Sequence, residues 1–163
     1  MVLKRIVQMH NIWIHPFYYL VVRKKIIIET LNACKESIKS TQSDVVSVVI
    51  ATNRKIKYLN NLYRKTNEVT DVLSFNQDCY LDDGSLFLGE IIIAFPRLLK
   101  QARDKQINYL DELRLLLVHG YLHLMNFNHE TKSDKIKMWS LQSQVLIYLG
   151  VKTELLDLEE EEN

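Results

Sequence analysis

The sequence is poor in glycine and proline, with 4 and 2 respectively among 163 residues. It therefore contains no flexible linker rich in these residues that would separate two domains, and its length fits one domain. We expect residues 1–152 to form a single domain and residues 153–163 to form an acidic tail.

Cysteine is equally scarce. Cys34 and Cys79 are the two cysteines, they lie far apart in the chain, and no secretory signal precedes them. These facts argue against a fold held together by disulfides. We expect a buried Cys34 and a Cys79 in a loop.

The sequence lacks a hydrophobic run long enough to cross a membrane. The apolar run near its start, Ile12 to Val22, contains His15 and Pro16 and is shorter than the roughly 20 residues that a spanning helix needs. It is also not followed by a small-residue cleavage site. We therefore expect a cytoplasmic protein that has no membrane partner.

Neither sign of charge dominates overall, since the chain has 21 basic and 20 acidic residues. Six of the acids lie in residues 153–163, so residues 1–152 carry 14 acids and a formal charge of +7. A basic body is compatible with a polyanionic partner such as RNA, although solvated lysines on an ordinary surface would give the same count.

Hydrophobic patterns predict a sheet covered by helices. The runs that read as strands are Val2–Met9, Val45–Ile50, Asp71–Phe75 and Leu86–Ile93, with a turn at Asp82-Asp83-Gly84. The run Val45–Ile50 is nearly continuous and β-branched, which favours burial on both faces. Phe17 to Val22 fits either the helical or the strand period.

Apolar residues at spacings of three and four predict the helices. The first helix ends at Ile38, the second is capped by Thr52 and ends near Arg64, and the third covers Pro96–Lys105. The fourth helix is capped by Asn108 and runs to Leu124. The fifth is capped by Thr131 and ends near Gly150. This order of strands and helices predicts an α+β fold.

Three of the five histidines lie in the segment VHGYLHLMNFNHE, residues 118–130. His119 and His123 are four residues apart on a helix, so both imidazoles can reach one ion. His129 can join them only if the chain turns, and Asn126 is a residue that readily adopts the left-handed conformation. Three histidine ligands with an open fourth position are typical of catalytic zinc.

Other interpretations of the histidines remain open. A histidine pair at this spacing also occurs by chance, and His10 and His15 have no such context. Zinc peptidases use HExxH, in which a glutamate follows the first histidine as general base; Gly120 occupies that position, which disfavours peptide cleavage. Glu130 is best explained as a solvated loop acid, and Asp71 and Ser74 could line the site.

The segment HGYLHLMNFNH resembles the motif HGxLHLxGYDH of the YbeY family of single-strand-specific metallo-endoribonucleases. Three upstream blocks, in Leu59–Arg64, Thr70–Phe75 and Leu88–Ile91, are similar to its LNxxYR, TDVLSF and LGDI blocks. The chain departs from the family at Asn126, Phe127 and Asn128, where the motif has Gly, Tyr and Asp, and at Glu90, where it has Asp.

This resemblance implies one Zn²⁺ held by His119, His123 and His129 with a water as fourth ligand, and Arg64 and His119 as catalytic residues. It implies a four-stranded mixed sheet with helices. It also implies cleavage of single-stranded RNA in ribosomal RNA maturation, at the 3′ end of 16S rRNA, and ribosome quality control with the small subunit as partner. The alternative is a non-catalytic ribosome-assembly factor with a structural metal.

Overall fold

The computed structural model describes residues 10–38 and 44–152. Its strands are β1 (Asn11–Ile14), β2 (Asp44–Ala51), β3 (Val72–Tyr80) and β4 (Leu86–Ala94). Its helices are the short 3₁₀ helix η1 (Pro16–Tyr18), α1 (Lys24–Ile38), α2 (Asn53–Arg64), α3 (Phe95–Asp104), α4 (Tyr109–Leu124) and α5 (Lys132–Tyr148). The predicted strand Val2–Met9 and the predicted acidic tail, residues 153–163, lie outside the described residues.

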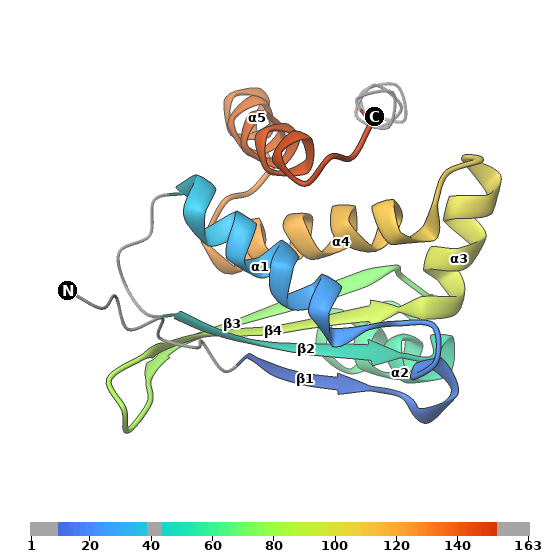
Figure 1. Ribbon diagram of the computed structural model, residues 1–163. Helices are drawn as coiled ribbons and strands as arrows, with labels where there is room; N and C mark the ends of the chain where they lie inside the picture. The colour runs from blue at the N-terminus through green and yellow to red at the C-terminus, as the bar shows by residue number, and fades with distance from the viewer. Residues whose placement is uncertain (1–9, 39–43, 153–163) are drawn as a thin grey trace.

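The four strands form one mixed sheet in the order β1-β2-β4-β3. β1 and β2 run parallel, as do β2 and β4, whereas β3 is antiparallel to β4. β3 is thus an edge strand joined to β4 by a hairpin, which projects beyond the rest of the sheet in Figure 1. The architecture confirms the predicted α+β class with a four-stranded mixed sheet.

Helices cover both faces of this sheet. α1, α4 and α5 lie over one face, and α2 lies against the other (Figure 1). Side chains of β4 alternate accordingly: Ile91 and Ile93 join the larger core beneath α4, and Ile92 and Ala94 join a smaller core beneath α2. Burial on both faces explains the nearly continuous apolar run in β2.

The helix starts are as the sequence predicts. The side-chain oxygens of Thr52, Asn108 and Thr131 accept backbone N–H groups at the first turns of α2, α4 and α5. Each bond satisfies a donor that has no partner within its helix. Pro96 stands in the first turn of α3, where its missing N–H costs nothing.

Two features differ from the expectations. β1, Asn11–Ile14, is a strand that the sequence did not predict, and it precedes the run Phe17–Val22 for which neither period could be chosen. Its four residues form a strand only by pairing with β2, which is a tertiary interaction. β3 continues to Tyr80, so Cys79 is an exposed strand residue rather than a loop residue, beyond an irregularity in the pairing with β4. Cys34 is buried as expected, and burial raises the pKa of its thiol above the ordinary range.

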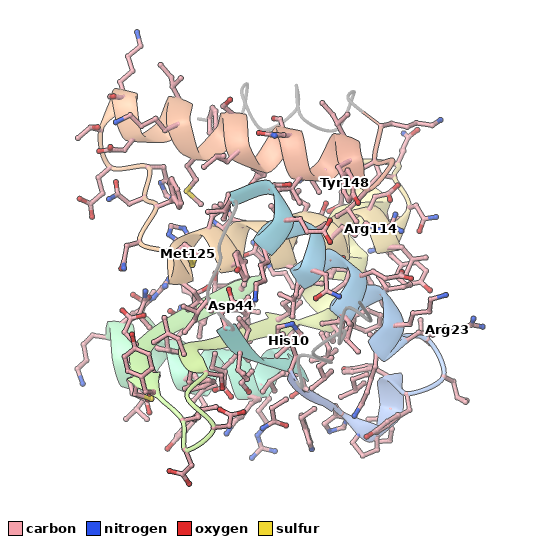
Figure 2. The ribbon with its side chains drawn as sticks, turned by 60° about the vertical axis from the view of Figure 1, so that its left-hand side comes forward. His10, Arg23, Asp44, Arg114, Met125 and Tyr148 are labelled. Carbon is pink, nitrogen blue, oxygen red and sulfur yellow. The ribbon has the colours of Figure 1, made fainter. Side chains whose placement is uncertain are left out.

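Buried polar contacts tie α4 to the rest of the fold. Tyr121 Oη donates to Asp44 Oδ2 at 2.6 Å, and Lys35 Nζ of α1 lies 3.1 Å from Asp44 Oδ1. Figure 2 labels Asp44, the first residue of β2, and His10, which directly precedes β1. Among the described residues no helix is both long and apolar enough to cross a membrane.

Candidate metal centre

The candidate site lies where α4 ends. Asn126 has φ of 62°, the left-handed conformation that its residue type allows. Its N–H donates to the carbonyl of His123 (2.9 Å), and the N–H of Phe127 donates to that of Leu122 (3.0 Å). This pair of bonds is a Schellman motif, with Phe127 packed on the core. The predicted turn at Asn126 is therefore present.

This turn brings the three histidines of the segment together. His119 and His123 project from the last turns of α4, and His129 returns from the loop before α5. One ring nitrogen from each of the three lies within 4.8 Å of the other two. Figure 2 labels Met125 at the end of α4, where the chain begins this turn.

Hydrogen bonds on the far ring nitrogens orient two of the imidazoles. His119 Nδ1 is 3.2 Å from Oε1 of Gln142 on α5, and His123 Nδ1 is 3.0 Å from the carbonyl oxygen of Phe127. A carbonyl oxygen can only accept, so each Nδ1 carries the proton and each Nε2 carries a lone pair. Such partners hold metal-ligating histidines in the required tautomer.

The two lone pairs point at each other, because Nε2 of His119 and Nε2 of His123 are 3.0 Å apart. Two acceptors at this distance repel unless a cation lies between them. Tetrahedral zinc with Zn–N bonds of about 2.0–2.1 Å would separate its ligand nitrogens by roughly 3.3 Å. The donor set therefore fits a metal ion of this kind.

Burial keeps the pair neutral. It lowers the pKa of His119 to about 4, and it also lowers the pKa of His123, with a further contribution from the charge of His129. Neutral imidazoles are the forms that bind metals. His129 is exposed, so the cluster opens to solvent on the side away from the core.

Gly120 faces the sheet. A Cβ at this position would lie 2.9 Å from Cγ2 of Ile91 and 3.1 Å from Oγ of Ser74. A glutamate at position 120, which a zinc peptidase would need as its general base, would therefore collide with the strands. Ser74 thus packs beneath α4, and Glu130 is exposed as expected.

Arg64, at the C-terminal end of α2, lies near the histidines from the opposite side of β3. Its positive charge contributes to the lowered pKa of His123. It also lines a polar pocket of about 360 Å³ together with Arg97, Thr66 and Thr70. Both arginines are exposed, and within the described ranges neither forms an ion pair. Two such guanidinium groups can bind a phosphate.

Asp71 stands beside this region, held by three donors. Its Oδ1 accepts from the N–H of Val72 and the hydroxyl of Thr70, and its Oδ2 accepts from Nε2 of Gln101. Its negative charge raises the pKa of His119, against the larger effect of burial. Asp71 is therefore near enough to act on the site electrostatically.

Sequence reasoning missed two side chains at the site. Gln142 is buried on α5, and the signal was a polar residue on the face that carries Met138, Val145 and Leu146. Asn76 of β3 has its Nδ2 within 3.0–3.3 Å of the carbonyls of His123 and Leu124 and of Asn126 Oδ1. No local sequence pattern predicts the contacts of Asn76, because its partners are about 50 residues away in the chain.

Comparisons with known proteins show which proteins this chain is similar to. The sequence model described as "Endoribonuclease YbeY" matches residues 21–150. An endoribonuclease YbeY of Aster yellows witches'-broom phytoplasma is 33% identical over 153 residues, which cover 90% of this chain and 95% of the relative. That of Thermodesulfovibrio yellowstonii is 39% identical over 116 residues, covering 69% and 71%. A solution structure of a Thermotoga maritima protein matches with a TM-score of 0.58 and 25% identity, covering 85% of this chain and 87% of that one.

Proposed function

Because the chain belongs to the endoribonuclease YbeY family, we propose that it is a zinc-dependent, single-strand-specific endoribonuclease. The observation that carries the metal requirement is the pair of Nε2 lone pairs 3.0 Å apart in an open cluster of three histidines. His119, His123 and His129 would hold one Zn²⁺, with water as the fourth ligand.

Zinc bound there would polarise a phosphoryl oxygen and lower the pKa of water from 15.7 towards about 7. The chain's own groups supply the positioning. Gln142 and the Phe127 carbonyl keep both Nε2 atoms turned towards the ion. His119, itself a ligand, and Arg64 are the residues that we propose to be catalytic.

We assign the phosphate to Arg64. The arginine is exposed, lies close enough to lower the pKa of His123, and shares its polar pocket with Arg97. A guanidinium can hold two phosphate oxygens at once and stabilise charge that develops during cleavage. Arg97 would bind a neighbouring phosphate of the same strand.

We further propose that the substrate is ribosomal RNA, cleaved in the cytoplasm during maturation of the 3′ end of 16S rRNA and in ribosome quality control. The small ribosomal subunit would be the partner, and residues 1–152 would act as one hydrolase domain. The formal charge of +7 on these residues supports a polyanionic substrate.

Replacing Arg64 with alanine tests this assignment. We expect Arg64→Ala to lower single-stranded RNA cleavage by roughly a hundredfold or more, as loss of one transition-state donor does elsewhere. Zinc content should stay unchanged, because Arg64 is not a ligand. Arg97→Ala, the matched variant in the same pocket, should mainly raise KM. Full cleavage by Arg64→Ala would show that the assignment is wrong.

A non-catalytic assembly factor is the second candidate. Its support is that the ion would join α4 to the loop before α5, while Gln142 of α5 holds a ligand, so the metal could serve only to fix these helices. This alternative predicts that His119→Ala lowers the melting temperature and that no preparation cleaves RNA.

A further inference from the structure

A groove of about 810 Å³ lies on the sheet face that carries α2. We call it the α2 groove. Its floor includes Glu90 and Ile92 of β4, its walls include Trp13 of β1 and Tyr63 of α2, and Phe75 of β3 lines it on the side of the metal centre.

Flat aromatic rings stand exposed on opposite walls of the groove. Trp13 is 49% exposed and Tyr63 is 62% exposed, although both are large apolar side chains. Tyr63 packs on Phe75 with ring centroids 4.9 Å apart, which fixes the orientation of both rings. Exposed, oriented rings beside a cationic surface are the usual platforms on which unpaired bases stack.

Helix α2, which lines one side of the groove, is basic. The sequence of α2 and the following residue contains Arg54, Lys55, Lys57, Arg64 and Lys65 and no acid. The three basic residues of its first turns are exposed, and Lys55 itself lines the groove. This charge attracts a polyanion and disfavours a basic protein segment as the occupant.

The groove and the metal centre meet at edge strand β3, because Asn76 both lines the groove and contacts the end of α4. Phe75 lines the groove, and the next residue, Asn76, contacts the carbonyl of His123 at the end of α4. Arg64 follows Tyr63 on α2 and acts electrostatically on the same histidine. A strand whose phosphate lies at the histidines can therefore place neighbouring bases in the groove by crossing β3.

Glu90 is the exception in this basic surface. It is half-buried in the floor, where its Oε1 accepts the hydroxyl of Ser47 at 3.0 Å. A carboxylate can only accept hydrogen bonds, so a base that contacts it must offer donors. The exocyclic amino group of cytosine, adenine or guanine does so, whereas the one ring donor of uracil, N3–H, is flanked by the acceptors O2 and O4, which a carboxylate repels.

We propose that the α2 groove binds unpaired nucleobases of the RNA strand, and that Glu90 favours a base with an exocyclic amino group over uracil. This inference rests on the proposed function, since it takes single-stranded RNA as the substrate. Trp13 and Tyr63 supply the stacking surface, and Glu90 reads the edge of the base.

Binding of RNA oligonucleotides in the presence of a metal chelator tests the proposal, because the proposed hydrolysis by zinc-activated water cannot proceed without the ion. Labelled hexamers of cytidine and of uridine form a matched pair, since the two pyrimidines have nearly the same shape. By fluorescence anisotropy, we expect wild type to bind the cytidine hexamer about fivefold more tightly, the ratio that one specific base contact gives. Glu90→Gln should abolish this preference.

Stacking is tested separately. Trp13→Leu and Tyr63→Ala should each weaken binding of both hexamers by about tenfold, the effect of losing one base stack. Tyr148→Ala, which removes an exposed tyrosine from α5, is the matched control and should bind as wild type does. Circular dichroism of each variant verifies folding.

Two results would overturn the proposal. One is equal affinity of the wild type for the two hexamers. The other is unchanged RNA binding by both stacking variants, which would indicate that the groove binds a protein partner instead. Cleavage assays separate this outcome from failure of the proposed function. A protein that cleaves RNA but shows no groove effect contradicts this inference alone. One that binds as described but never cleaves contradicts the nuclease assignment alone.

Discussion

Imidazole orientation is the residue-scale feature on which the site depends. His119 and His123 have their Nδ1 atoms against oxygen acceptors and their Nε2 atoms against each other. The sequence predicted the three histidines and the turn at Asn126 correctly, because both are local: a helical spacing and a residue type that tolerates positive φ. The sequence did not predict the role of Gln142, because its hydrogen bond to His119 forms only when α5 packs on α4.

We predict that Gln142→Leu weakens zinc binding by about 10–100-fold, since outer-sphere partners of metal-ligating histidines have effects of this size. Leucine fills a similar volume but cannot accept a hydrogen bond from Nδ1–H of His119. Competition with a chromophoric chelator measures the affinity. Gln142→Glu keeps the acceptor and serves as the control; equal losses in both variants would assign the effect to packing.

At the scale of elements, α4 is positioned by close contact with the sheet. Gly120 allows this contact, since a Cβ would lie 2.9 Å from the Ile91 side chain. The sequence predicted the extent of α4 well because Asn108 caps it and its apolar residues repeat. It did not predict β1, whose four residues become a strand only by pairing with β2.

Gly120→Ala should therefore destabilise the protein by about 1–2 kcal/mol, because overpacking outweighs the roughly 1 kcal/mol that alanine adds in helix propensity. Urea unfolding in chelator measures this without metal linkage. In the Ile91→Ala background the same substitution should cost less, as the colliding methyl groups are gone. The same cost in both backgrounds would contradict the contact as its cause.

At the scale of the whole molecule, buried neutral histidines make stability depend on pH. Burial lowers the pKa of His10, whose Nδ1 accepts the N–H of Val46, and lowers that of His119 to about 4. The unfolded chain binds these protons near pH 6.5, whereas the folded protein does not. The free energy of unfolding therefore falls as pH drops below 6.5.

Urea titrations of metal-free protein between pH 7 and pH 5 measure this fall. His10→Asn preserves an acceptor for Val46 but cannot be protonated, so its stability should decrease less over this range. An equal decrease in wild type and variant would contradict the contribution of His10.

The α+β class followed from the sequence because β2, β3, β4 and the five α-helices each carry their own pattern. The four-stranded mixed sheet followed from the family resemblance, and the structure confirms it. The α2 groove did not follow, since its residues come from five separate elements and meet only in the folded chain.

Zinc add-back to metal-free protein tests the central claim most directly. Cleavage of a single-stranded RNA should be absent in chelator, should rise in proportion to added zinc, and should saturate near one ion per chain; His119→Ala should show no such rise. Cleavage by the metal-free protein, or none at one zinc per chain, would contradict a zinc-dependent nuclease built on His119, His123 and His129.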